Sequence, residues 1–123
     1  MATLAEASLA DAERRTLERL VDVLRQELGS ELRAVWLFGS RASGDNPHEE
    51  SDVDLIVLTK EGGAHDQGRV IDLLFDAADA DGAAPTYFSA HVRDPEWVAE
   101  RRAIDDFFIR EVDRDKIVLF GKP

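Results

Sequence analysis

The stretch WLFGSRASGDNPHEESDVDLIVL, residues 36 to 58, joins two apolar segments through a polar loop. The first segment ends at Gly39-Ser40, and the second begins with Asp52-Val53-Asp54. An unpaired charge beside a buried strand is costly, and two like charges side by side are costlier still. We therefore expect a compensating group beside the two aspartates.

The overall composition is that of one small soluble domain. The chain has 123 residues, of which 44% are hydrophobic. No apolar run approaches the roughly 20 residues of a membrane span, and the N-terminus lacks the basic start and apolar centre of a secretory signal. There is no cysteine, so a disulfide framework and a thiolate metal site are excluded. These features predict a cytoplasmic protein that does not bind membranes.

The charge balance is strongly acidic, with a formal net charge of −11. Such a field repels phosphate backbones and argues against extended binding to DNA or RNA. Only 3 of the 15 basic residues are lysine, and 15 of the 26 acids are aspartate. This bias is typical of proteins adapted to high salt, although a GC-rich genome would also favour arginine. The sequence leaves a halophilic origin open.

The first half of the chain alternates predicted helices and strands. Residues 8–28 have leucines at helical spacing, and Gly29 supplies a stop. Residues 32–38 and 52–58 are apolar on both faces, as in central strands of a covered sheet. Residues 64–80 are predicted to form a second long helix.

The second half continues the alternation. Residues 85–92 read as a strand, and Asp94 as N-cap with Pro95 at the first helical position opens a third helix. Mostly apolar residues at helical spacing continue this predicted helix to Val112, and residues 116–120 are predicted to form a last strand. The order predicts an α/β (α+β) fold with a small mixed sheet of about four strands, flanked by three main helices. The whole chain, residues 1–123, is predicted to be a single domain.

The spacing of the two aspartates suits a metal site. Side chains alternate across a strand, so Asp52 and Asp54 point to the same face, about 7 Å apart along the backbone. Two converging carboxylates are typical ligands of Mg²⁺, and a cation would offset their mutual repulsion. The alternative is that both acids flank the strand as solvated loop residues.

The Gly-Ser pair at the end of the first strand suits a phosphate group. Glycine lets a ligand approach the backbone closely, and exposed N–H groups with a hydroxyl donor bind phosphate oxygens. The alternative for Gly39 and Ser40 is a simple strand-ending turn with Ser40 as a helix cap. Arg41 either pairs with the phosphate or is solvated.

Taken together, these motifs resemble a known signature. Gly-Ser-Arg-Ala (39–42), followed by Ser-Asp-Val-Asp-Leu (51–55), is similar to the motif pair of the polymerase-beta-like nucleotidyltransferases. Within that superfamily the chain resembles the minimal nucleotidyltransferase domains of bacteria and archaea. The similarity extends over nearly the whole chain in element order, and its specific part is residues 39–55.

The resemblance implies a nucleotidyltransferase fold and Mg²⁺-dependent transfer of a nucleoside monophosphate, with AMP from ATP the first candidate. Asp52 and Asp54 are then the catalytic, metal-binding residues, and Gly39, Ser40 and Arg41 bind the nucleotide. The acceptor is a hydroxyl of a protein or small molecule. Minimal domains of this kind are often paired with a small helical HEPN-type ribonuclease, which they restrain as antitoxins.

One expected residue is absent. Active members of the family carry a third carboxylate on a later strand, but the matching strand here holds Ser89 and His91. His91 is either a substitute general base or a structural residue. Three hypotheses stay open: an active enzyme, a module that holds nucleotide or partner without transfer, and a purely structural domain.

The aromatic residues of the third helix have two interpretations. Trp97 and Phe108 are assigned to the core, with a dimer or heteromer interface as the alternative. The sequence does not fix the oligomeric state, the acceptor or the nucleotide base.

Overall fold

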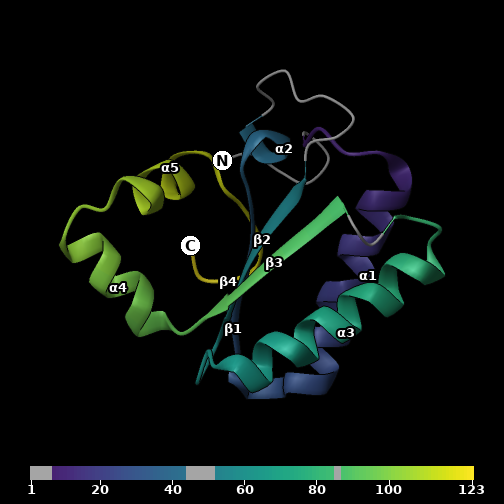
Figure 1. The fold of residues 1–123 in the computed structure, drawn as a ribbon, viewed down its shortest axis with the longest axis horizontal. Helices are drawn as coiled ribbons and strands as arrows, with labels where there is room; N and C mark the ends of the chain where they lie inside the picture. Colours follow the sequence, from purple (N-terminus) through teal and green to yellow (C-terminus); the bar gives the residue numbers. More distant parts are fainter. Residues whose placement is uncertain (1–6, 44–51, 85–86) are drawn as a thin grey trace.

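A computed structural model describes residues 7–43, 52–84 and 87–123, apart from the side chains of Ser40 and Ser43. The chain runs through α1 (Asp11–Leu28), η2 (Gly29–Glu31), β1 (Leu32–Phe38), α2 (Ser40–Ser43), β2 (Val53–Thr59), α3 (Ala64–Ala80), β3 (Phe88–Arg93), α4 (Pro95–Ala103), α5 (Phe107–Asp115) and β4 (Ile117–Gly121). Figure 1 shows these elements arranged around one sheet.

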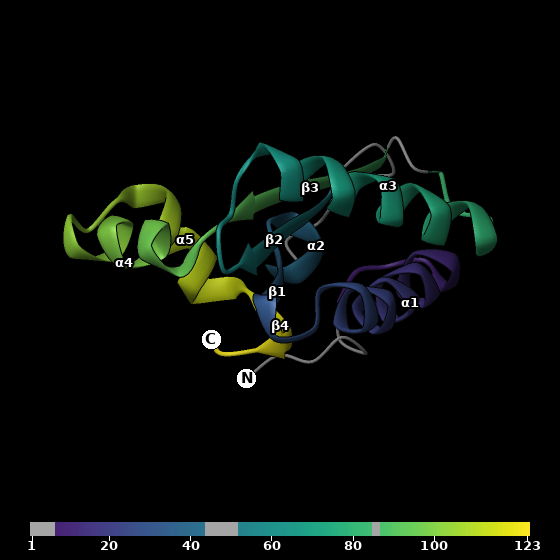
Figure 2. The same ribbon diagram turned by 90° about the horizontal axis from the view of Figure 1, so that it is seen from below.

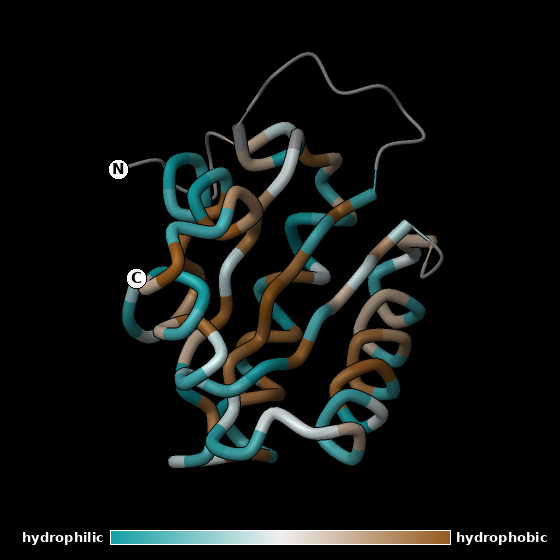
Figure 3. The backbone as a smooth tube through the Cα atoms, turned by 60° about the vertical axis from the view of Figure 1, so that its left-hand side comes forward, coloured by the Kyte–Doolittle hydropathy of each residue, from teal (hydrophilic) through white to brown (hydrophobic). Residues whose placement is uncertain are grey.

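The sheet is mixed and has the strand order β3-β2-β1-β4. Strand β1 pairs antiparallel with β2 and β4, whereas β2 pairs parallel with β3. The parallel pair requires a crossover, which α3 provides. Strands β1 and β2 therefore lie at the centre, and almost all their side chains are buried. Figure 3 shows the hydrophobic stretches of the chain in brown.

Two hydrophobic layers hold the sheet. On one face, α1 and α3 pack on alternate strand residues such as Val35, Leu55 and Val57. On the opposite face, α4 and α5 pack on Trp36, Ile56 and their neighbours. Figure 2 shows the two helical layers on either side of the strands. The period-2 alternation of side chains thus divides each central strand between two cores.

The structure confirms the predicted fold class and most element positions. The segments 32–38 and 64–80 form β1 and α3. Helix α1 begins at Asp11 rather than at residue 8, because Glu13 Oε1 accepts a hydrogen bond of 2.8 Å from the Ala10 N–H and fixes the helix start there. The predicted strand 85–92 is β3, although residues 85–86 lie outside the described part of the chain.

The prediction of one long third helix was wrong. Helix α4 ends at Ala103 and α5 begins at Phe107, with Asp105 between them at a φ of 54°. The Asp106 N–H donates to the Arg101 carbonyl at 3.0 Å, which closes the end of α4. The chain turns here because Ile109 and Val112 then bury against the sheet, where a straight helix would carry them away from it.

No helix in the described ranges combines the length and apolar character needed to cross a membrane.

Candidate active site

Asp54 lies near the start of β2, on the face of the sheet that α4 and α5 cover. Its Cα partner is Phe38 on β1 on one side and Ser89 on β3 on the other. Further along the same strand, Ile56 and Leu58 occupy this face and belong to the core. The carboxylate is therefore the polar end of an otherwise apolar row.

The two predicted metal ligands interact electrostatically. Burial raises the pKa of Asp54, and the nearby charge of Asp52 raises it further, to about 6. Asp52 itself is exposed and precedes the strand. Within the described residues neither carboxylate forms an ion pair with Lys, Arg or His. A divalent cation would fit this donor set, because it would offset the repulsion that disfavours ionised Asp54.

Gly39 touches Asp54 at the end of β1. It has a φ of 79°, and a methyl group added to its Cα would lie 2.6 Å from Asp54 Oδ2. Any other residue type would be strained in this backbone conformation, and its Cβ would also force the Asp54 carboxylate to move. The glycine thus lets the Asp54 carboxylate lie directly against the end of β1.

Arg41, the third residue predicted to bind nucleotide, points toward α1. Its Nη1 donates to Glu13 Oε1 at 2.8 Å and to the Ser8 carbonyl at 3.1 Å. The Arg41 side chain is only 9% exposed and that of Glu13 only 13%. This pair ties α2, and with it the Gly-Ser turn, to α1. The Ser40 side chain and residues 44–51 lie outside the described part of the chain.

Strand β3 brings Ser89 and His91 to the same face as Asp54. Ser89 stands directly beside Asp54 in the parallel register. The Ser89 Oγ and the His91 Nε2 are 3.5 Å apart, and burial together with Arg93 lowers the pKa of His91. No described residue adds a third carboxylate, and no cluster of three or more metal-ligating side chains occurs in the described ranges. Two carboxylates are enough for Mg²⁺ when substrate phosphates supply further oxygens.

An aromatic row continues from the site onto α4 and α5. The centroid of the Phe38 ring lies 6.1 Å from that of the His91 ring and 5.6 Å from that of the Phe108 ring. The centroids of the Phe108 and Trp97 rings are 6.4 Å apart. Phe108 is 41% exposed, so it is not fully a core residue. Sequence analysis missed Phe38 as a neighbour of the site. The only signal for it was its position next to Gly39.

Two solved structures resemble this chain in fold, and one family model matches its sequence. A search of curated proteins found no match. A solved structure described as a toxin-antitoxin with AMP-PNP matches with 19% identity and a TM-score of 0.53, over 85% of this chain and 73% of the other. A mutant of the toxin-antitoxin MntA-HpeT matches with 17% identity and a TM-score of 0.51, over the same shares of the two chains.

At these identities the structural matches show the likeness of fold, and the family assignment comes from the sequence. The family model described as "Polymerase beta, Nucleotidyltransferase" matches residues 18–122, which contain the Gly-Ser turn, both aspartates and all four strands. The chain belongs to the polymerase beta nucleotidyltransferase family.

Proposed function

We propose that the protein is a Mg²⁺-dependent nucleotidyltransferase that moves AMP from ATP to a hydroxyl of a protein or small molecule. One observation supports this most directly. The half-buried Asp54 is next to the like charge of Asp52, has no cationic partner among the described residues, and packs against a glycine whose missing side chain leaves room for its carboxylate. The family and the AMP-PNP in a neighbour's description agree with a nucleotide substrate.

Each predicted site residue has a role in this proposal. Asp52 and Asp54 would hold Mg²⁺, which when bound supplies positive charge to the triphosphate and to both carboxylates. The backbone of Gly39 and Ser40 would approach the phosphate oxygens. Arg41 is proposed to act on the nucleotide either through a direct contact or by holding the turn in place through Glu13, its partner in the structure.

In the proposed reaction the acceptor oxygen attacks the α-phosphorus of ATP. The bond between the α-phosphorus and the bridging oxygen to the β-phosphate breaks, and pyrophosphate leaves. Most of the rate enhancement in such transfers comes from positioning and electrostatic stabilisation rather than from covalent chemistry. The site fits this requirement, because Asp54 is held by the central strand of the sheet.

We also propose that the acceptor or regulatory partner is a protein, a small helical HEPN-type ribonuclease that the chain restrains as an antitoxin. Both structural neighbours are described as toxin-antitoxin proteins. The surface of α4 and α5 supports a protein contact: Ile104 is 68% exposed and Phe107 is 71% exposed. Contiguous exposed apolar patches are typical of interaction sites, and these two residues are three apart in the sequence.

Label transfer from ATP tests the enzyme. The purified chain, with a co-expressed helical partner, is incubated with Mg²⁺ and ATP labelled at the α-phosphate. We expect label on the acceptor and its loss in Asp54→Asn. The matched control is Asp22→Asn, because Asp22 is an exposed carboxylate on α1. Equal labelling by Asp54→Asn and the unmodified chain would contradict the proposal.

A second candidate function, a module that binds nucleotide without transferring it, is favoured by one observation. The strand position beside Asp54 holds Ser89 in place of a carboxylate. Mg²⁺-ATP at 100 times its dissociation constant would raise the free energy of unfolding by about 2.7 kcal/mol. Stabilisation without label transfer would identify the binding module, and the absence of both would leave a structural domain.

A further inference from the structure

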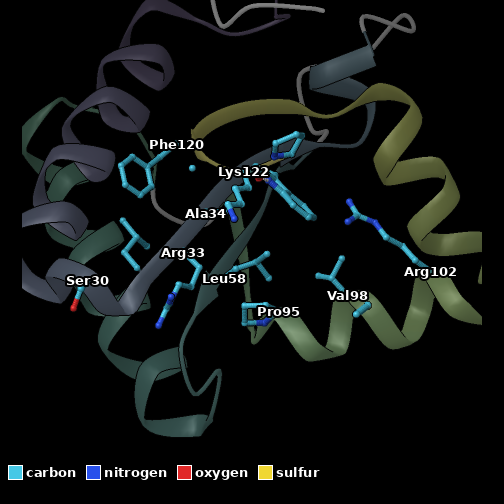
Figure 4. Close-up of a pocket in the computed structure, with 14 residues that line it drawn as sticks. Ser30, Arg33, Ala34, Leu58, Pro95, Val98, Arg102, Phe120 and Lys122 are labelled. Atoms are coloured by element: carbon cyan, nitrogen blue, oxygen red, sulfur yellow. Dashed lines mark hydrogen bonds between the residues drawn. The ribbon is translucent and has the colours of Figure 1, made fainter.

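A cavity of about 590 Å³ lies between the sheet and α4, away from the two aspartates. Figure 4 shows its lining, with Leu58 from β2 and Val98 from α4 among the apolar residues. Leu58 follows Asp54 by four residues on one strand, which separates the two positions by about 13 Å. The volume is in the range of pockets that bind small organic molecules. The cavity is thus separate from the site proposed for nucleotide transfer.

The charged side chains that line this cavity are all basic. Arg33, Arg102 and Lys122 line it, and none of its lining residues is acidic. This is unusual in a chain with 26 acidic and 15 basic residues. Arg102 is held by Asp113 through bonds of 2.9 and 2.8 Å, whereas Arg33 and Lys122 form no side-chain ion pair within the described residues. Two positive side chains therefore stand beside an apolar lining that contains no acidic side chain.

Trp36 forms a rigid part of the lining. It is 1% exposed, and its Nε1 donates to the Lys122 carbonyl at 2.8 Å, which fixes the C-terminal segment beside the cavity. Lys116 Nζ lies 3.9 Å from the centre of the ring, and the guanidinium of Arg102 lies 5.7 Å from it. A lining held in this way is preorganised, so a ligand loses little affinity to ordering it.

We propose that this cavity binds a small amphipathic anion, a carboxylic acid with an aliphatic or aromatic body. The hydrocarbon body would contact Pro95, Ala99 and Phe120, the apolar lining residues that keep accessible surface, because Leu58, Val98 and Trp36 are almost fully buried. The carboxylate would lie at the rim, between Arg33 and Lys122. The apolar lining selects against fully polar anions, and the positive rim selects against apolar cations. The site goes beyond the proposed transfer reaction and shares no residue with it.

Titration with a series of probes of one length tests the proposal. Octanoate, octanol and octylammonium carry the same hydrocarbon body with a negative, a neutral and a positive head. We expect octanoate to bind at least about tenfold more tightly than octanol, because that difference in affinity corresponds to one charge-assisted hydrogen bond. Octylammonium should not bind. The measurements are calorimetry and the ¹⁵N–¹H signal of the tryptophan indoles. The chain has two tryptophans, so the Trp36 signal should shift while that of Trp97 serves as the internal control.

Two variants locate the binding. The double change Arg33→Glu with Lys122→Glu should weaken octanoate more than octanol, and Ala99→Trp should weaken both by filling the cavity, which Ala99 lines. The matched controls are Arg15→Glu and Ala80→Trp, which change exposed helical residues on the opposite face of the sheet. Failure of octanoate to bind at millimolar concentration overturns the proposal. Equal binding of all three probes, or binding without a Trp36 shift, also overturns it.

Discussion

At the residue scale, Asp54 couples stability to pH. Burial and the charge of Asp52 raise its pKa to about 6 in the folded protein, above the ordinary value of 3.8. A raised carboxylate pKa means that the folded state holds the proton more tightly, so stability decreases as pH rises from about 4 to about 6. Above this window, Asp54→Asn should raise the free energy of unfolding by about 1 kcal/mol, after discounting for solvent screening at a half-buried group.

Urea unfolding of both proteins without metal, at the two ends of this window, provides the measurement. The gain in the free energy of unfolding from Asp54→Asn should be present at neutral pH, where Asp54 is ionised in both the folded and the unfolded protein. It should be absent near pH 4, where the folded protein keeps Asp54 protonated. Added Mg²⁺ with ATP should reverse the order of stability at neutral pH, because only the carboxylate attracts the cation. A gain that is independent of pH would show that Asp54 is not electrostatically strained.

Gly39 allows a second test at this scale. Gly39→Ala places a Cβ at a φ of 79° and 2.6 Å from Asp54 Oδ2. We expect a loss of about 1–3 kcal/mol in the free energy of unfolding and loss of Mg²⁺-ATP binding.

The matched control for Gly39→Ala is Gly68→Ala, because Gly68 lies inside α3 and an added Cβ would meet no atom within 4 Å beyond its chain neighbours and the nearby helix backbone. That change should stabilise the protein by about 0.5–1 kcal/mol, since alanine favours a helix over glycine. If the two alanine variants had equal stability and equal affinity for Mg²⁺-ATP, the contact between Gly39 and Asp54 would have no role.

At the element scale, Asp105 separates α4 from α5. Its φ of 54° is left-handed, a conformation that aspartate tolerates better than most residues and that glycine adopts freely. Asp105→Gly should leave stability unchanged or raise it by up to about 1 kcal/mol, whereas Asp105→Val should lower it by about 1–2 kcal/mol. Thermal unfolding measures both changes.

The control separates backbone strain from charge. Asp105 lies 3.5 Å from Arg110, and both side chains are mostly exposed. Arg110→Ala removes that ion pair and leaves the turn intact, so we expect almost no effect. A loss with Arg110→Ala as large as that with Asp105→Val would assign the effect to the ion pair.

At the scale of the whole molecule, the net charge of −11 predicts that salt stabilises the fold. Self-repulsion opposes the compact state, and the Debye length falls from about 10 Å at 0.1 M salt to about 3 Å at 1 M. We expect the melting temperature at neutral pH to rise with potassium chloride. Near pH 4.6, where the sequence is close to neutral, the same salt should have little effect. Equal salt dependence at both pH values would argue against repulsion as the cause and against adaptation to high salt.

Much of this fold was predictable from local signals. Strand β1 follows from its continuous apolar run and helix α3 from the helical spacing of its apolar residues. Asp94 accepts a hydrogen bond of 2.7 Å from the Trp97 N–H, as its place before Pro95 predicts. These features depend on residues close in sequence. The Gly-Ser turn and the paired aspartates were recognisable for the same reason.

What required the tertiary structure depends on contacts between distant residues. Helical spacing continues past Asp105, so only burial of Ile109 against the sheet explains the turn there. The pairing of Arg41 with Glu13, and of Ser89 with Asp54, joins segments that no local pattern connects. The sequence by itself determined which residues carry charge and which elements carry them. The packing of the sheet decided which charges are buried together, because the free energy of a buried charge depends on its neighbours in space.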